Sequence, residues 1–245
     1  VLALFDENYV RATFFVLGWV AERHPDLVRS IVAGGHEVAS HGMQHTRVTQ
    51  QERAEFRSDI ERSKKLLEDV SGRAVRGYRA ASYSIGRDNL WAHDELTEAG
   101  YVYSSSIYPI HHDLYGMPEA PRFAFRFSRD GILEVPITTV AFNGRKFPCG
   151  GGGYFRLLPY RVSKWALESV NKRDKQPAVF YFHPWEIDPE QPRIAGIDAK
   201  TRFRHYLNLK RMHKRLARLV KDFKWGRMDE IFLGLTQSRH KEVAL

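Results

Sequence analysis

Short apolar runs alternate with longer amphipathic stretches along this chain. The apolar runs predict β-strands at residues 12–17, 36–42, 75–80, 101–110, 131–137 and 177–185. The stretches between them repeat apolar residues at helical spacing, and they predict helices at residues 19–35, 49–72, 88–100, 158–171 and 200–227. Strands that alternate with helices of this length are typical of βαβ units. The pattern therefore predicts an α/β fold with a parallel sheet, either open or closed into a barrel.

The domain organisation follows from the length and from the evenness of the pattern. A chain of 245 residues is long enough for one large α/β domain. The middle region, 108–158, is rich in proline, glycine and aromatic residues, but no repeat, low-complexity tract or linker composition interrupts the chain. We therefore expect one domain over residues 1–245.

The composition is that of a globular protein, with 43% hydrophobic and 27% charged residues. No run approaches the roughly 18 apolar residues that a membrane helix needs, so no transmembrane segment is expected. The one cysteine, Cys149, excludes a disulfide within the chain and favours a reducing compartment such as the cytoplasm. The printed sequence starts at Val1 within an apolar pattern, so we expect the encoded N-terminus, with any signal peptide, to lie upstream.

The net charge of +9 is concentrated near the C-terminus, where residues 200–227 hold eleven basic residues and one acidic residue. Leucines and a methionine recur at helical spacing in this segment, which predicts a helix with a packed apolar face and a solvated basic face. An alternative is a surface that docks on an anionic polymer or membrane. No nucleic-acid-binding signature accompanies the charge, so nucleic acid is not an expected partner.

Polar residues of the types that catalyse reactions or bind metals follow several of the predicted strands. The segment SHGMQH places His41 and His45 four residues apart after one strand; Arg79, Ser104–Ser106 and His183 lie at the ends of others. Ligands gather at the carboxyl ends of the strands in a parallel sheet. On this pattern alone, the histidines are either a metal clamp or two structural side chains.

The same segments carry a resemblance to a known family. The stretches RATFFVLGWVAERHPDLV, GGHEVASHGMQHTRV, GYRAASYSI, GYVYSSSIYPI and FYFHPWEIDP resemble the polysaccharide deacetylases of the NodB-homology type, carbohydrate esterase family 4. The stretches GGGGYFRLLPY and HPWEIDP are similar to the bacterial branch associated with exopolysaccharide gene clusters. The likeness runs from about Val1 to about Trp225, with the branch-specific portion at about 108–230.

The resemblance implies a distorted (β/α) barrel that removes N-acetyl groups from the amino sugars of a polysaccharide or its precursor. It also implies a divalent metal, usually Zn²⁺. His41 and His45 match two metal ligands, and their spacing predicts that both imidazoles lie on one face of a helical turn. His183 matches the residue that protonates the leaving amine, and Arg79 matches the arginine that orients the catalytic aspartate.

Four further residues are expected to contact the substrate. The resemblance implies that Tyr83 and Ser105 help to shape the acetyl-binding groove. Tyr154 follows four glycines and could stack on a sugar ring, although a plain turn explains these glycines equally well. Trp185 is expected at the rim of the groove, and Glu186 as a hydrogen-bonding support.

The chain departs from the family pattern at its start. The family carries two aspartates, a base and a third metal ligand, on the first barrel strand; residues 1–15 instead correspond to the helix after that strand. The barrel is therefore expected to lack its first strand here, and Asp6 does not replace the missing pair. Either the pair is encoded upstream of Val1, which we favour, or the protein is a non-catalytic member that binds carbohydrate.

Overall fold

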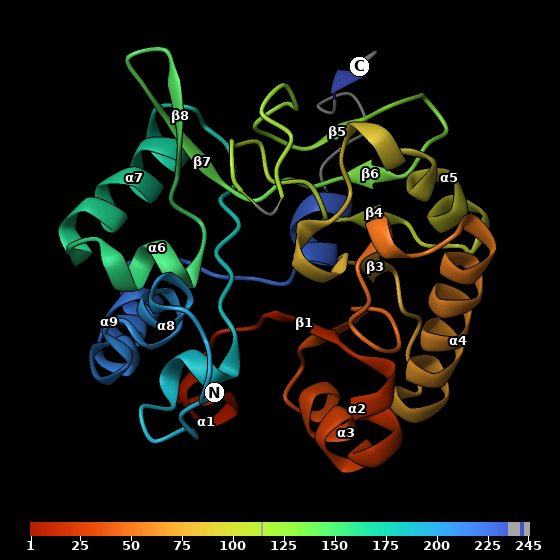
Figure 1. Cartoon of the computed structure of the whole chain (residues 1–245), viewed down its shortest axis with the longest axis horizontal. Helices are drawn as coiled ribbons and strands as arrows, with labels where there is room; N and C mark the ends of the chain where they lie inside the picture. The colour runs from red at the N-terminus through yellow and green to blue at the C-terminus, as the bar shows by residue number, and fades with distance from the viewer. Residues whose placement is uncertain (114, 235–240, 243–245) are drawn as a thin grey trace. The chain divides into compact units, whose positions relative to one another are not determined.

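The computed structural model describes residues 1–113, 115–234 and 241–242. They form two compact units, which Figure 1 colours by residue number. The sheet unit holds residue 2, residues 9–136 and the described residues from 225 onward. The helical unit holds residue 1, residues 3–8 and residues 137–224. The expectation of one deacetylase domain over the whole chain stays a prediction.

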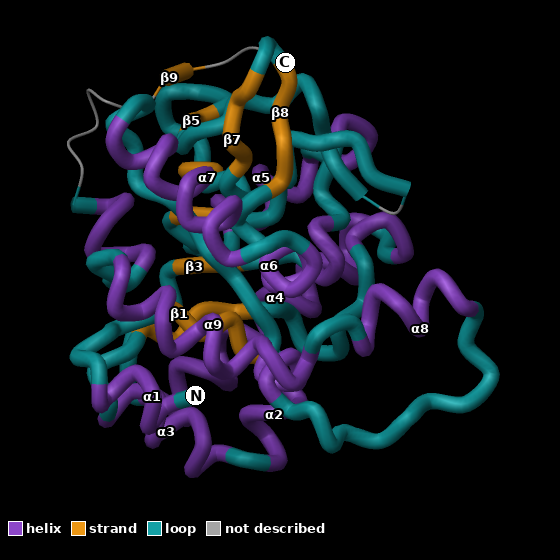
Figure 2. Tube along the Cα trace, turned by 90° about the vertical axis from the view of Figure 1, so that its left-hand side faces the viewer, coloured by secondary structure: helices purple, strands orange, loops and turns teal. Residues whose placement is uncertain are grey.

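The sheet unit is built on a largely parallel sheet. Among the described residues this sheet has seven strands in the order β1-β2-β3-β4-β6-β5-β9. The strands are β1 (Thr13–Val16), β2 (Glu37–Ser40), β3 (Gly77–Tyr78), β4 (Tyr103–Ser104), β5 (Phe125–Arg126), β6 (Leu133–Glu134) and β9 (Lys241–Glu242). Neighbours from β1 to β6 pair in parallel, β5 pairs antiparallel with β6, and β9 pairs parallel with β5. Figure 2 shows the strands as short segments between long loops. The predicted α/β class with a parallel sheet is confirmed.

Helices cover this sheet and supply much of its core. They are α2 (Gly18–Arg23), α3 (Pro25–Ala33), α4 (Arg53–Ser71) and α5 (Trp91–Glu98), with short turns η1 (Val48–Gln50), η2 (Ala81–Tyr83), η3 (Arg87–Asn89) and η5 (Asp229–Leu233). The long helix α4 contacts β2 and lies beside α5 along one side of the sheet (Figure 1). Its apolar stripe, which includes Phe56, Ile60 and Leu67, is fully buried.

Two predicted helix boundaries in the sheet unit are wrong. The predicted helix 19–35 is two helices, because Pro25 lacks the N–H that a continuous helix needs and instead occupies the first position of α3. The predicted helix 49–72 begins only at α4, after the short turn η1. Glu52 caps the start of α4 in a capping box with Glu55, so the helix begins later than predicted. The end of the helix at Gly72 is as predicted.

The helical unit contains one hairpin and several helices among its described residues. The hairpin strands are β7 (Thr139–Phe142) and β8 (Arg145–Pro148). The helices are α1 (Leu2–Glu7), α6 (Gly152–Leu157), α7 (Tyr160–Lys172), α8 (Ala199–Tyr206) and α9 (Leu209–Asp222), with the turn η4 (Pro184–Ile187). A long loop leads into α8 (Figure 2). No helix among the described residues combines the length and apolar character needed to cross a bilayer.

Two predicted elements of the helical unit are also wrong. The predicted strand 177–185 makes only one isolated bridge, between Tyr181 and Gly151. Its neighbouring aromatic rings pack against other rings instead, as Phe180 does against Phe155. The predicted helix 200–227 is divided into α8 and α9 at Asn208, whose φ of 52° is left-handed. The helix α9 does bury an apolar face and expose a basic one, as its pattern predicted.

Candidate functional site

Three neighbouring parallel strands of the sheet unit end in polar side chains. His41 follows β2, Arg79 follows β3 and Ser105 follows β4. Each of the three donates its backbone N–H, at 2.9 Å, to the carbonyl of the last residue of the neighbouring strand. The hydrogen bonding between the strands therefore extends one residue beyond each strand end. Their side chains therefore emerge at one edge of the sheet, as the strand pattern predicted.

The two histidines of the SHGMQH segment lie together at this edge. Their ring centroids are 4.9 Å apart and the ring planes meet at 75°. His41 is half-buried and its Nδ1 lies 2.6 Å from the backbone carbonyl oxygen of Arg79. Because a carbonyl only accepts, this contact places the proton on Nδ1 and leaves Nε2 as the basic nitrogen. The His41 ring is thus fixed in a tautomer that can bind a cation through Nε2.

The histidines do not meet through a helical turn, so that part of the prediction is wrong. The chain bends at Gly42, whose φ is +79°, and at His45, whose φ is +57°. Both carboxylate oxygens of Asp59 on α4 accept the N–H of Met43 at 3.1 Å, and a Cβ on Gly42 would lie 2.7 Å from Asp59 Oδ2. Burial raises the pKa of Asp59 above its ordinary value, against the lowering effect of the Met43 hydrogen bond. Asp59, which the sequence did not single out, therefore shapes the loop that joins the two imidazoles.

Arg79 is buried, and its side chain is held in a fixed position. Its Nε donates to the carbonyl of Ser105 at 3.0 Å and its Nη2 donates to the Ser105 hydroxyl at 2.8 Å. The guanidinium also lies 4.0 Å from the centre of the Phe15 ring. Ser105 is fully buried. Ser105 therefore holds Arg79 in position, and its expected contact with substrate stays a prediction.

A second buried charge, Glu134 on β6, fixes the chain just after Ser105. Its Oε1 accepts the backbone N–H groups of Ser106 and Ile107 at 2.9 Å each, and its Oε2 lies 2.9 Å from Nε2 of His93 on α5. Burial on its own raises the pKa of Glu134, but the His93 contacts and the backbone donors outweigh it and hold the pKa below its ordinary value. Glu134 was not among the expected site residues, although it is the one acidic residue inside the apolar run GILEVPI.

The turn that follows Arg79 is strained. Ser82 and Tyr83 have φ values of 53° and 51°, a left-handed conformation that costs energy in residues with a Cβ and that clusters at functional sites. The Tyr83 ring is buried, and its centre lies 5.7 Å from the Arg79 guanidinium. On its other edges it meets the rings of Tyr108 and Tyr115, each at 5.7 Å between centroids. Tyr83 thus connects the Arg79 position to the aromatic loop that contains Tyr115.

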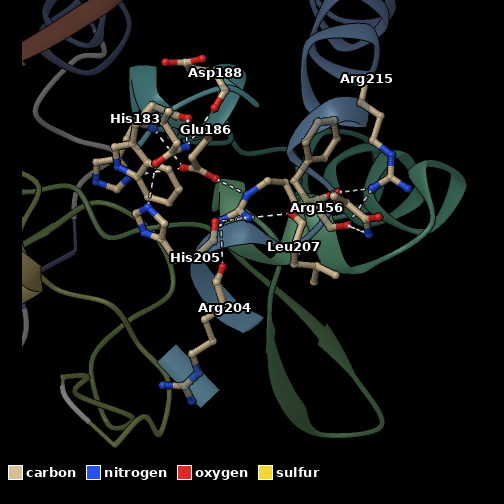
Figure 3. Close-up of polar contacts among 12 residues, drawn as sticks. Arg156, His183, Glu186, Asp188, Arg204, His205, Leu207 and Arg215 are labelled. Atoms are coloured by element: carbon tan, nitrogen blue, oxygen red, sulfur yellow. Dashed lines mark hydrogen bonds and ion pairs between the residues drawn. The ribbon is translucent and has the colours of Figure 1, made fainter. Parts of the chain in front are cut away.

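The helical unit holds the remaining predicted site residues, around a buried charge network (Figure 3). His183 has about half of its side chain exposed, and both its backbone N–H and its Nδ1 face Glu186 Oε1, at 3.0 and 3.2 Å. Arg156 Nε donates to Glu186 Oε2 at 2.8 Å. Burial alone raises the pKa of Glu186, but the hydrogen bonds from His183 and Arg156 outweigh it, so the pKa is lowered. His183 follows an extended segment, not the predicted strand.

Arg156 anchors this network to the junction of α8 and α9. Its Nη atoms donate to three backbone carbonyls, at 2.7 to 3.1 Å: those of Arg204, His205 and Leu207 (Figure 3). Trp185 is half-buried, with the His205 ring stacked on it at 4.2 Å and the His183 ring at 5.6 Å. Tyr154 lies half-buried on α6. The structure thus groups His183, Trp185 and Glu186 closely within this unit; the catalytic and substrate-binding roles assigned to its residues stay predictions.

The histidine pair fits two positions of a zinc site. Neutral imidazoles are common zinc ligands, and the carbonyl contact of His41 is the kind of outer contact that orients a ligating ring. Across the described residues, no group of three or more His, Cys, Asp or Glu side chains is arranged to hold a metal ion.

Comparison with known families divides the chain into two parts. The family model described as "Polysaccharide deacetylase" matches residues 1–103. The model described as "Domain of unknown function (DUF3473)" matches residues 105–233. The first of these segments contains His41, His45 and Arg79, and the second contains His183.

Curated relatives match the first part. Over 96 residues the chain is 33% identical to a chitooligosaccharide deacetylase from Bradyrhizobium sp. (strain ANU 289), a match that covers 39% of this chain and 42% of the relative. It is 29% identical over 96 residues to a peptidoglycan-N-acetylglucosamine deacetylase from Bacillus cereus, covering 39% and 35%. The chain spans less than half the length of these relatives.

A solved structure matches the fold. A crystal structure from Mycobacterium smegmatis assigned to the polysaccharide deacetylases aligns with all of this chain and 78% of its own, with a TM-score of 0.65 and 21% identity. This likeness agrees with the predicted fold class.

Proposed function

Because the chain belongs to the DUF3473 family and its first 103 residues match the polysaccharide deacetylase model, we propose that it removes N-acetyl groups from amino sugars. The substrate class is an N-acetylated oligosaccharide or polysaccharide. The names of the two curated relatives, a chitooligosaccharide deacetylase and a peptidoglycan-N-acetylglucosamine deacetylase, support this class.

The observation that carries the proposal is the pairing of two imidazoles 4.9 Å apart at the carboxyl end of β2. His41 and His45 would hold a divalent metal, which we propose to be Zn²⁺. When bound, such a metal polarises a carbonyl oxygen and lowers the pKa of a bound water. The contact of His41 Nδ1 with the Arg79 carbonyl orients the ring and leaves Nε2 as the nitrogen that would bind the metal.

The other residues have supporting roles. The side chain of Arg79, which follows the strand next to that of His41, is held in place by Ser105; we assign its positive charge to the orientation of a catalytic carboxylate. We assign His183 to protonation of the leaving amine. The Glu186 carboxylate at its Nδ1 fixes the tautomer and the ring orientation, so that the transferred proton leaves from Nε2.

We further propose that the substrate is a polysaccharide made for export or its precursor. The motifs GGGGYFRLLPY and HPWEIDP, which resemble the branch associated with exopolysaccharide gene clusters, support this assignment. Both lie in the segment matched by the DUF3473 model. Deletion of the gene is expected to raise the acetyl content of the polysaccharide that the producing cells make, as measured by NMR; an unchanged acetyl content contradicts this assignment.

The test of the activity is acetate release from the N-acetylglucosamine tetramer by the protein expressed from its complete reading frame. His45→Ala is expected to lower the rate by more than the roughly 10- to 100-fold that loss of an outer-shell contact costs. His24→Ala, which removes an exposed histidine of the same unit, is the matched control and is expected to keep the wild-type rate. Wild-type activity in His45→Ala would refute the proposed role of the pair.

The same experiment separates the non-catalytic alternative. A protein that binds the tetramer saturably but releases no acetate, even with added Zn²⁺, would be a carbohydrate-binding member of the family.

A further inference from the structure

The helical unit carries more positive charge than the chain as a whole. Residues 137–224 hold 19 basic and 7 acidic residues, whereas the net charge of the entire chain is +9. Two of these cations have internal roles: Arg156 is buried against Glu186, and Arg215 donates to backbone carbonyls at the end of α6. Most of the others are exposed and take no part in the chemistry proposed above.

Helix α9 aligns five exposed cations on its outer side. Its apolar side chains are buried on the opposite side. The cations recur at spacings of three, four and seven residues, which places them along one side of the helix: Lys210, Arg211, Lys214, Arg218 and Lys221. Among the described residues, the one member of this set that pairs with a carboxylate is Arg218, at 3.8 Å from Asp222. The set forms a stripe of positive charge about 16 Å long.

Helix α7 adjoins this basic stripe. Asp222, at the end of α9, accepts from Lys164 Nζ at 2.9 Å and from the Tyr160 hydroxyl at 2.6 Å. The outer side of α7 carries Arg161 and Trp165, both exposed and one helical turn apart. The positive surface of α9 therefore extends onto α7 and reaches an exposed aromatic ring.

The hairpin of β7 and β8, which lies beside α7, adds two more exposed rings (Figure 1). Trp165 is 46% exposed and meets Phe142 edge to face, with ring centroids 6.1 Å apart. Phe142 and Phe147 are 51% and 44% exposed, and the pairing of Phe142 with Arg145 and of Val140 with Phe147 puts both rings on one face of the hairpin. Large aromatic side chains that cluster in water mark an interaction surface.

We propose that the basic stripe of α9 and the three rings of the hairpin and α7 dock the protein on a membrane that contains anionic lipid. Lysine and arginine are attracted to anionic headgroups, and tryptophan and phenylalanine enter the boundary between headgroups and acyl chains. A second copy of the chain fits this surface poorly, because a symmetric contact sets like charges against each other. A soluble anionic polymer matches the charge but offers no apolar layer to the rings. This inference goes beyond the proposed function and does not rest on it.

Co-sedimentation with vesicles of equal parts phosphatidylglycerol and phosphatidylcholine tests the role of the charge, using the protein expressed from its complete reading frame. Each lysine near an anionic surface strengthens binding roughly fivefold, so the triple variant Lys210→Gln, Lys214→Gln, Lys221→Gln is expected to bind roughly 100-fold more weakly. Binding of wild type is expected to fall as salt is added. A control with the same change in net charge, expected to bind like wild type, places glutamine at three exposed cations of the sheet unit: Arg73, Arg76 and Arg129.

The aromatic side chains are tested with the same vesicles. The tryptophan emission of wild type is expected to shift to the blue, and Trp165→Phe, which keeps a ring, is expected to bind but to lose most of the shift. The double variant Phe142→Ser, Phe147→Ser is expected to bind at least roughly tenfold more weakly. Tyr9→Ser, which removes a 96% exposed ring of the sheet unit, is its control and is expected to bind like wild type. Circular dichroism of each variant verifies that the fold is kept.

The outcomes are independent of acetate release, so a failure of the deacetylase function leaves them unchanged. Weaker binding in the α9 triple variant and in the hairpin double variant, with normal binding in both controls, supports the proposal. Wild-type binding in the hairpin variant means that charge alone acts and overturns it; tight binding to alginate would then assign the stripe to a soluble anionic polymer. No vesicle binding by wild type, or an equal loss in the sheet-unit control, also overturns the proposal.

Discussion

Glu37 lies buried at the start of β2, and its replacement by glutamine is expected to stabilise the protein at neutral and alkaline pH. Its Oε1 accepts from the Tyr103 hydroxyl at 3.0 Å, and its Oε2 accepts from the hydroxyl of Thr13 and from the N–H of Asp229 at 3.2 Å. Burial is the main cause that raises its pKa to about 7, and the nearby Asp229 carboxylate, itself paired with Arg227, adds to the effect.

The sign and size of the effect follow from this difference in pKa. Between the ordinary value of 4.5 and the folded value of about 7, the folded protein holds more protons at Glu37 than the unfolded chain does. The contribution of this group to stability therefore falls as pH rises through that window. At roughly 1.4 kcal/mol per pH unit the loss amounts to about 3 kcal/mol by pH 8. Glutamine resembles the protonated acid in shape and charge, so the variant avoids the loss.

The assay is urea denaturation of wild type and Glu37→Gln at several pH values from 5 to 8. The difference between their free energies of unfolding is expected to shift in favour of the variant as pH rises, by roughly 2.5 kcal/mol between pH 5 and pH 8. Glu22→Gln, at an exposed carboxylate, is the matched control. Parallel curves for wild type and Glu37→Gln would refute the reasoning about the buried carboxyl.

Three further changes test other parts of the account. Glu134→Ala leaves a buried histidine and two backbone N–H groups without their carboxylate, so urea denaturation is expected to show a loss of about 3–5 kcal/mol; a loss below 1 kcal/mol would contradict the pairing. Arg156→Met is expected to lower the free energy of unfolding by a similar amount, because Glu186 then stays charged and buried without its partner. If this is the cause, the double variant Arg156→Met, Glu186→Gln is expected to be as stable as wild type. Gly42→Ala strains a backbone at φ +79° and crowds Asp59, so zinc titration is expected to show at least a roughly tenfold weaker affinity. Unchanged affinity in Gly42→Ala would mean that the loop conformation does not set the geometry of the histidines.

The periodicity of the chain was enough to predict the first strands of the sheet unit and their parallel pairing. Strands at residues 12–17, 36–42 and 75–80 are apolar and bounded by helices with glycine stops, which is a local pattern. Since parallel strands share one carboxyl edge, the positions of His41 and Arg79 at that edge followed from the strands alone.

The contacts that shape the site were not predictable in the same way. Asp59 and Glu134 act on residues that lie 16 to 41 positions away in the sequence, and no local pattern encodes such a pairing. The spacing of His41 and His45 suggested a helical turn, because it matches helical geometry. Instead, the left-handed backbone at Gly42 and the hydrogen bond that the Met43 N–H donates to the Asp59 carboxylate bring the two rings together.

The helical unit was predicted least well. Residues 177–185 have the composition of a buried strand, but their backbone forms only one isolated bridge, between Tyr181 and Gly151. The Phe180 ring packs against Phe155 of α6. The basic segment reads as one helix, because the left-handed turn at Asn208 has no proline or glycine to mark it. Packing among distant segments, not local preference, decides both outcomes.

The most direct measurement is a Zn²⁺ titration of the metal-depleted protein from the complete reading frame, with acetate release from the N-acetylglucosamine tetramer recorded at each step. The account predicts that activity rises with occupancy of one zinc site per chain, and that both binding and activity are lost in His41→Ala and in His45→Ala. Acetate release that persists in either variant, or that does not depend on added metal, would contradict the account.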